Sequence, residues 1–89
     1  MKITPINKSG IHKTGVLTNI TIGEIIAILG FPPNVQDDPD KVRHSWGFKV
    51  KGKECGIWDY RGSETVGMFS TYGPDYIFNE LFPNNYGRY

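Results

Sequence analysis

This chain of 89 residues contains little cysteine, and its positive and negative charges are nearly balanced. Cys55 is the only cysteine, so no internal disulfide can form. With His12 and His44 as the only histidines, the chain also lacks the four nitrogen or sulfur ligands of a structural zinc site. The formal net charge is +1, which argues against a coat for long nucleic acid or a polybasic membrane anchor, because both need a large basic excess.

Long apolar runs and known catalytic motifs are missing too. The longest apolar run, Ile25 to Leu29, is far too short to cross a bilayer, and the polar stretch from Met1 to Lys13 does not resemble a signal peptide. We therefore expect a soluble cytoplasmic protein. The sequence contains no glycine-rich phosphate loop, nucleophile elbow or metal-hydrolase helix motif, so we expect no enzyme activity, no metal and no cofactor.

Aromatic residues, in contrast, are plentiful. They make up 13% of the chain, and their large side chains supply enough apolar surface for the core of one small domain over residues 1–89. At its two ends we expect an extended arm over 1–17, with a strand near Gly15 to Leu17, and a tail over 83–89.

Two short amphipathic helices are predicted. Thr21 and Glu24 form a capping box at the start of a helix over 22–29. A second helix is expected over 74–82, with Pro74 at its first position. Both carry apolar residues at the spacing of one helical face.

The middle of the chain predicts β-structure. Residues 41–50 alternate between apolar and polar side chains, as in a half-buried strand, and 54–60 form the returning strand of a hairpin. A third strand over 65–71 completes an antiparallel meander of three strands, or of four if the arm joins it. The expected fold is therefore α+β, with the meander over 41–71 flanked by two short helices.

The length of the hairpin turn decides which aromatic residues share a face of the sheet. An even-numbered turn, the commonest kind, places Trp58 and Tyr60 beside Lys49 and Arg43 on one face. An exposed aromatic shelf ringed by cations could stack a base there and meet its phosphate. A three-residue turn would instead put Trp58 on the face of Trp46. The arm or a helix could also cover this face, which would make Trp58 a core residue.

Two further segments carry candidate binding residues. Ser70, Thr71 and Tyr72 lead into the second helix, whose free amides could bind a phosphate, although ordinary capping explains the same residues. Arg61, in the turn before the third strand, could add a guanidinium group, but it is equally a plain turn residue. The acidic loop over 34–40 lacks the glycine and distal glutamate of a calcium loop, so we expect a solvated loop that could face a basic protein.

Cys55, His44 and Asp59 raise the possibility of a small hydrolase. They lie on adjacent strands and, with an even turn, on one face, so they could serve as nucleophile, base and orienting carboxylate. That face also carries Trp46 and Phe48, which is typical of a core, where cysteine behaves as a small hydrophobic side chain. We therefore rank hydrolase activity third.

The hairpin carries a sequence pattern over residues 41–61. The pattern reads KV…W-x-F…G…I-[WY]-D-Y-[KR]. The residues that match it are Lys41-Val42, Trp46-Gly47-Phe48, Gly52 and Gly56-Ile57-Trp58-Asp59-Tyr60-Arg61. This order resembles a hairpin of small phage-encoded early proteins, although Arg61 stands where lysine is expected. The resemblance implies a non-enzymatic viral protein in the host cytoplasm with a counter-defence role. Such a protein would either sequester a cyclic-nucleotide signal or block a host protein.

Two functions therefore lead. The first is a homo-oligomer, most simply a twofold dimer, that captures a small anionic nucleotide by aromatic stacking and by phosphate contacts. Its ligand-binding residues would be Trp58, Tyr60, Arg43, Lys49, Arg61, Ser70, Thr71 and Tyr72. The alternative is a protein-interaction inhibitor that presents exposed aromatic residues and the acidic loop to a host defence protein.

Overall fold

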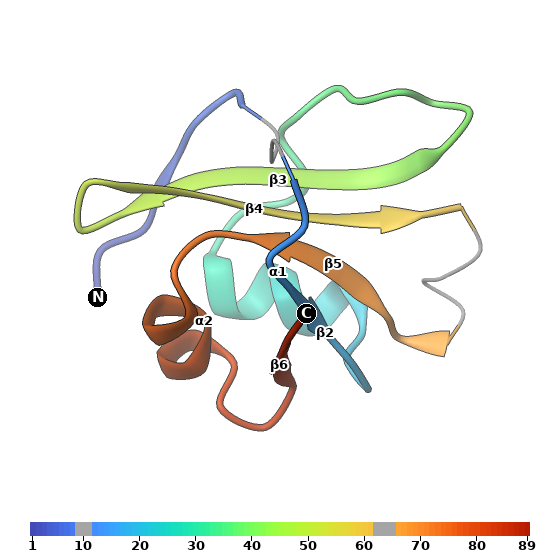
Figure 1. The fold of residues 1–89 in the computed structure, drawn as a ribbon. Helices are drawn as coiled ribbons and strands as arrows, with labels where there is room; N and C mark the ends of the chain where they lie inside the picture. The colour runs from blue at the N-terminus through green and yellow to red at the C-terminus, as the bar shows by residue number, and fades with distance from the viewer. Residues whose placement is uncertain (9–11, 62–65) are drawn as a thin grey trace.

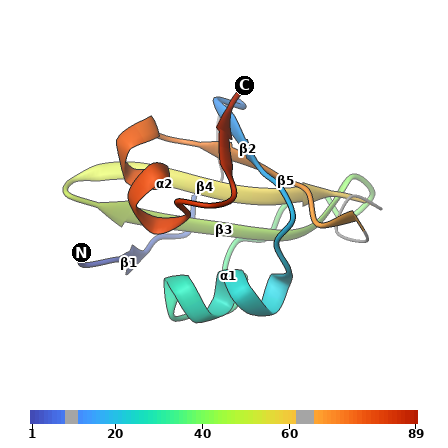
Figure 2. The same ribbon diagram turned by 90° about the horizontal axis from the view of Figure 1, so that it is seen from below.

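The structure is a computed structural model that describes residues 1–8, 12–61 and 66–89. Within these residues, six strands form one antiparallel sheet with two helices beside it (Figure 1, Figure 2). In chain order the elements are β1 (Thr4–Pro5), β2 (Gly15–Leu17), α1 (Ile22–Leu29), β3 (Val42–Val50), β4 (Lys53–Tyr60), β5 (Phe69–Tyr72), α2 (Asp75–Leu81) and β6 (Tyr86–Arg88). The strand order across the sheet is β1-β3-β4-β5-β2-β6. The predicted α+β class is confirmed, whereas the predicted sheet of three or four strands is wrong.

Residues of the predicted N-terminal arm and C-terminal tail enter the sheet as strands. β1 pairs with β3 through Thr4 and Lys49, and β6 pairs with β2 through Tyr86 and Leu17. The strand expected near Gly15 is confirmed as β2, which lies between β5 and β6. β1 and β6 contain two and three residues. So few residues cannot show an alternating pattern, and they are strands because a neighbouring strand offers hydrogen bonds.

The central meander differs from the prediction mainly in its last strand. β3 and β4 lie within one residue of their predicted bounds. β5 begins at Phe69 rather than Thr65 and ends at Tyr72. Thr65 lies outside the described residues, and Gly67 has a left-handed φ of 70°, which a regular strand cannot contain.

The first predicted helix, over 22–29, is confirmed as α1. Its capping box is present: the Thr21 hydroxyl accepts the Glu24 N–H at 3.1 Å, and the Glu24 carboxylate accepts the Thr21 N–H at 3.0 Å. Gly30 ends the helix in a left-handed conformation. α2 is one residue shorter at each end than predicted, because Pro74 is its N-cap rather than its first helical residue. Neither helix in the described part of the chain is long and apolar enough to cross a membrane.

The hydrophobic core lies between the two helices and one face of the sheet, here called the core face. Trp46, Phe48 and Ile57 of the central strands are fully buried there, together with Ile25 of α1 and Phe78 of α2. In Figure 1 both helices lie below β3 and β4, whereas the segments after β1 and before β3 pass above them. Because burying each such side chain contributes about 1.5–3 kcal/mol, the core face supplies the main hydrophobic stabilisation.

The opposite face of the sheet, here called the second face, is covered at Gly47. A Cβ atom on Gly47 would lie 2.2 Å from the backbone oxygen of Lys8 and 2.5 Å from that of Ile6. The Asn34 side chain joins these segments: it donates to the carbonyl oxygens of Ile6 and Gly47 and accepts the Gly47 N–H, each at 3.0 Å. The lack of a side chain at Gly47 therefore allows the N-terminal segment to pack directly on β3.

Replacing Gly47 with alanine should destabilise the fold by about 1–3 kcal/mol, because the added methyl group would push against backbone atoms. The matched control is Gly23→Ala on α1, where a Cβ atom meets only Thr21 Oγ1, at 3.9 Å. That change should leave stability equal or raise it by up to about 1 kcal/mol, because alanine favours helix. Urea unfolding of both variants measures the difference, and a Gly47→Ala protein as stable as the wild type would contradict this packing.

Candidate functional site

The β3–β4 turn contains two residues, Lys51 and Gly52, which confirms the even-numbered turn. Both residues have left-handed φ angles, of 51° and 75°, as in the hairpin turns whose twist matches that of the flanking strands. Ser45 consequently pairs with Trp58. Because residues on a strand alternate between faces, Trp58 shares the second face with Lys49, as the even turn predicts.

The aromatic shelf is nevertheless not open. Trp58 is only 7% exposed, and it lies in register between Ser45 and Ser70, which are also buried. The prediction of an exposed Trp58 is therefore wrong, and the alternative of a covered second face is the one the structure shows. Tyr60 is 49% exposed, but without Trp58 it offers a single ring rather than a shelf.

The predicted ligand-binding residues lie in three separate places along the sheet. Near the end of β4 are Arg43, Tyr60 and Arg61, and in the buried middle are Trp58, Ser70 and Thr71. At the other end, beside the β3–β4 turn and the β5–α2 connection, are Lys49 and Tyr72. The turn and this connection lie at the same end of the sheet (Figure 1). Lys49 and Tyr72 line a common hollow.

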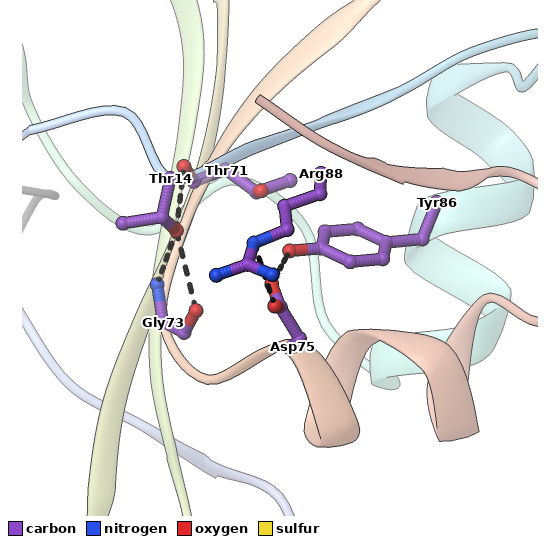
Figure 3. A network of polar contacts seen from close by, with 6 residues as sticks. All are labelled: Thr14, Thr71, Gly73, Asp75, Tyr86 and Arg88. Atoms are coloured by element: carbon purple, nitrogen blue, oxygen red, sulfur yellow. Dashed lines mark hydrogen bonds and ion pairs between the residues drawn. The ribbon is translucent and has the colours of Figure 1, made fainter.

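The polar groups between β5 and α2 bind other parts of the chain (Figure 3). The Gly73 N–H donates to Thr14 Oγ1 at 3.1 Å. At the first residue of α2, the Asp75 carboxylate accepts a hydrogen bond from the Tyr86 hydroxyl and pairs with Arg88, with 3.4 Å between Nε and Oδ2. The Asp75 carboxylate, near the helix start where the sequence raises the possibility of a bound anion, is therefore bonded within the chain.

A hollow of about 430 Å³ lies on the second face beside the β3–β4 turn. We call it the hairpin hollow, and its lining includes His12, Lys49, Lys53, Glu54 and Tyr72. They come from the N-terminal segment, from both strands of the hairpin and from β5. His12 and Lys53 are absent from the predicted set, because nothing in their local sequence shows that these distant segments meet.

The charges around the hairpin hollow are mostly positive. Glu54 is the one carboxylate among its described lining residues, and its Oε1 lies 2.7 Å from Lys8 Nζ. This hydrogen bond raises the pKa of Lys8 and lowers the pKa of Glu54. The pair is solvent-exposed and contributes little to stability. The ammonium group of Lys8 nevertheless offsets the negative charge of Glu54. Lys49 and Lys53 form no ion pair within the described part of the chain.

Tyr72 and His12 form an aromatic wall of the hairpin hollow. Their ring centroids lie 5.2 Å apart with an interplanar angle of 74°, an edge-to-face arrangement that is favourable for two rings. Tyr72 is half-buried, so the protein holds the ring in place while leaving part of it accessible. An aromatic wall next to two ammonium groups is suited to a ligand that carries both a ring and a negative charge.

A separate polar cluster holds Asp59, which is 0% exposed. Its Oδ1 accepts the backbone N–H groups of Arg43 at 3.1 Å and His44 at 2.6 Å, and its Oδ2 accepts the His44 Nδ1–H at 2.7 Å. A register shift between Val42 and Ser45 marks a β-bulge, which turns both amides toward one carboxylate. The predicted proximity of His44 and Asp59 is confirmed.

Cys55 does not complete a catalytic trio with this pair. It lies four residues from Asp59 along β4, a separation of roughly 13 Å on an extended strand. The residue is 2% exposed, and burial raises the pKa of its thiol from 9.0 to about 12. A thiol that stays protonated is a poor nucleophile, so Cys55 acts as a core residue.

The acidic loop before β3 is largely solvated. Asp38 and Asp40 are exposed, and the carboxylates of Asp37 and Asp38 accept loop N–H groups at 2.8 and 3.0 Å. Among the residues that the structure describes, no group of three or more His, Cys, Asp or Glu side chains could hold a metal ion.

The fold and the hollow together define a small α+β protein with a cationic, aromatic-lined surface site. No protein-family model, curated protein or solved structure matches this chain. Its function is therefore inferred from the geometry of the hairpin hollow and from the pattern of the hairpin sequence.

Asp59→Ala should lower the free energy of unfolding by about 2–5 kcal/mol, because it leaves buried N–H donors without an acceptor. Asp40→Ala is the matched control: this carboxylate is exposed, and its removal should change stability by less than about 0.5 kcal/mol. Urea unfolding of the two variants tests the difference. Similar stabilities would show that the Asp59 cluster does not hold the β-bulge.

Stability should fall as the pH rises from about 9 toward 12. Burial and the hydrogen bond to Asp75 raise the pKa of Tyr86 from 10.0 to about 12, and burial raises that of Cys55 to about 12. Between the unfolded and folded pKa values, unfolding releases protons, so each group lowers the free energy of unfolding by up to about 1.4 kcal/mol per pH unit. Below pH 9 their full contribution is present.

Urea unfolding at pH 8, 9, 10 and 11 measures this dependence. A Cys55→Ala, Tyr86→Phe double variant should lose less stability over that range than the wild type. An identical pH dependence in the two proteins would show that these groups do not cause it.

Proposed function

We propose that this protein is a non-enzymatic binding module that captures a small anionic nucleotide in the hairpin hollow. The proposal depends on one observation: Tyr72, Lys49 and Lys53 converge on a single hollow of about 430 Å³. This volume falls within the range of roughly 300–1,000 Å³ that is usual for small-molecule sites. The site is therefore large enough for a nucleotide.

The parts of the hairpin hollow suit different parts of a nucleotide. Stacking on an aromatic ring such as that of Tyr72 contributes about 1–3 kcal/mol per base. Ammonium groups such as those of Lys49 and Lys53 donate charge-assisted hydrogen bonds to phosphate oxygens, at about 1.5–3 kcal/mol each. Gly52 and Gly73 line the same hollow and leave space for the sugar.

This proposal keeps two of the residues that the sequence indicates and moves the site away from the others. Lys49 and Tyr72 remain ligand contacts, now joined by His12 and Lys53. Trp58 becomes a structural residue, since its ring is buried. The chemistry of the original hypothesis, stacking combined with phosphate contacts, is retained at the other end of β4.

The biological role that we propose is counter-defence. The hairpin sequence resembles that of small phage-encoded proteins, and a binding module without catalytic groups would act by sequestration. Capture of a nucleotide signal, cyclic or linear, would lower its free concentration in the host cytoplasm. The extent of this effect depends on the amount of protein relative to the signal.

A protein-interaction inhibitor is the second candidate. The observation that favours it is a group of exposed apolar side chains where β4 ends and β5 begins, with Tyr60 49%, Val66 66% and Met68 44% exposed. Aromatic residues and methionine are enriched in protein interfaces. This surface lies at the end of the sheet away from the hairpin hollow, so the two functions can be separated by mutation.

Thermal unfolding in the presence of mono-, di- and cyclic nucleotides tests the nucleotide proposal. A ligand at 100 times its Kd should stabilise the protein by about 2.7 kcal/mol, which raises the Tm of a domain this small by several degrees. Lys49→Gln should weaken binding by about tenfold, because it removes a charged donor. Lys41→Gln, which replaces an exposed lysine at the far end of β3, should bind as the wild type does.

Two outcomes would contradict the nucleotide proposal. One is the absence of a shift with every nucleotide, and the other is binding that Lys49→Gln and Lys41→Gln weaken equally. Loss of a host-protein complex in Met68→Asp, with nucleotide binding absent throughout, would support the inhibitor instead.

A further inference from the structure

A second hollow, of about 350 Å³, adjoins the hairpin hollow. We call it the lysine hollow, and its lining residues are Lys2, Thr4, Lys49, Lys51 and Gly52. Lys49 and Gly52 line both hollows. The two hollows therefore meet at the β3–β4 turn, with Lys49 and Gly52 at their boundary.

The two hollows differ in chemistry. In the lysine hollow, the charged side chains among the described lining residues are all lysines, and no aromatic ring is present. In the hairpin hollow, by contrast, lysines accompany Tyr72 and His12. A ligand that extends across both would place a ring in the hairpin hollow and a purely anionic part in the lysine hollow.

The backbone at the turn keeps the boundary between the hollows open. β1 pairs with β3 at Thr4 and Lys49, which brings Lys2 close to the turn. Gly52 has no side chain, and a Cβ atom there would meet no other atom within 4 Å. A bound molecule can therefore pass over Gly52 without displacing any part of the protein.

Among the described residues, none of the lysines that line the two hollows forms an ion pair, although Lys49 lies directly opposite Glu54 across the hairpin and attracts its carboxylate. Lys51 Nζ lies 5.8 Å from the ring centroid of Tyr76, an exposed cation–π contact that is weak enough for a phosphate to replace. Like charges gathered in one hollow repel one another, and a bound anion relieves that repulsion.

We infer that the ligand is a nucleotide with at least two phosphate groups, one in the hairpin hollow and the other in the lysine hollow. This inference rests on the proposed function and adds the ligand's class to it. A nucleoside polyphosphate and a dinucleotide, linear or cyclic, share this chemistry. In both, Lys49 lies between the two anionic groups.

Isothermal titration calorimetry of the wild-type protein with AMP, ADP, ATP, a linear dinucleotide with a terminal phosphate and a cyclic dinucleotide tests the inference. At least one ligand with two phosphates should bind about tenfold or more tightly than AMP, because it gains a second set of charge-assisted contacts. A comparison of ADP and ATP with the two dinucleotides identifies which source supplies the second phosphate. Equal affinities for AMP and for every longer ligand would overturn the inference.

Lys51→Gln and Lys2→Gln provide the matched variants. Each should reduce the affinity advantage of the longer ligand severalfold and leave AMP binding within twofold of the wild type, whereas Lys49→Gln should weaken both. If Lys51→Gln and Lys2→Gln leave the affinity for the longer ligand unchanged, the lysine hollow does not hold a phosphate and the inference fails while the proposed function stands. If AMP and all longer ligands fail to bind, the proposed function itself is wrong.

Discussion

The two-residue turn at Lys51 and Gly52 is the constraint on which the rest of the structure depends. Side chains alternate between the faces of a strand, so a turn longer by one residue would move every side chain of β4 to the opposite face. With two residues, Asp59 lies beside His44 and can accept the amides of the β-bulge. The same register leaves Lys49 on the second face, where it lines the hairpin hollow. Core, buried polar cluster and site all follow from one turn.

The close approach at Gly47 decides how much of the second face remains accessible. Residues 6–8 lie against this glycine, in contact with its backbone, and they help to cover the middle of the sheet, where Trp58 is buried. Further along the chain, His12 lies against the Tyr72 ring. The N-terminal segment thus covers β3 at Gly47 and contributes a wall to the hairpin hollow. The site that we propose lies beside the hairpin turn, away from the buried Trp58.

Features decided by neighbouring residues could be predicted from the sequence, and features decided by distant segments could not. The capping box and Gly30 define α1 locally, and the preference for even turns places His44 near Asp59. β1 and β6, in contrast, are too short to carry a pattern and depend on the strands beside them. The burial of Trp58 and the contact between His12 and Tyr72 arise in the folded chain, where distant segments meet. No local pattern predicts such contacts, so the hairpin hollow emerges only from the folded chain.

The pairing of polar groups distinguishes structural residues from binding residues. Asp59 accepts three hydrogen bonds, and Asp75 is bound by Tyr86 and Arg88, so these carboxylates are committed to the fold. Around the hairpin turn, in contrast, the lining lysines Lys2, Lys49, Lys51 and Lys53 form no ion pair among the described residues. Lysines gathered beside an aromatic wall repel one another, and a bound anion would relieve that repulsion. This arrangement supports the proposal of an anionic ligand.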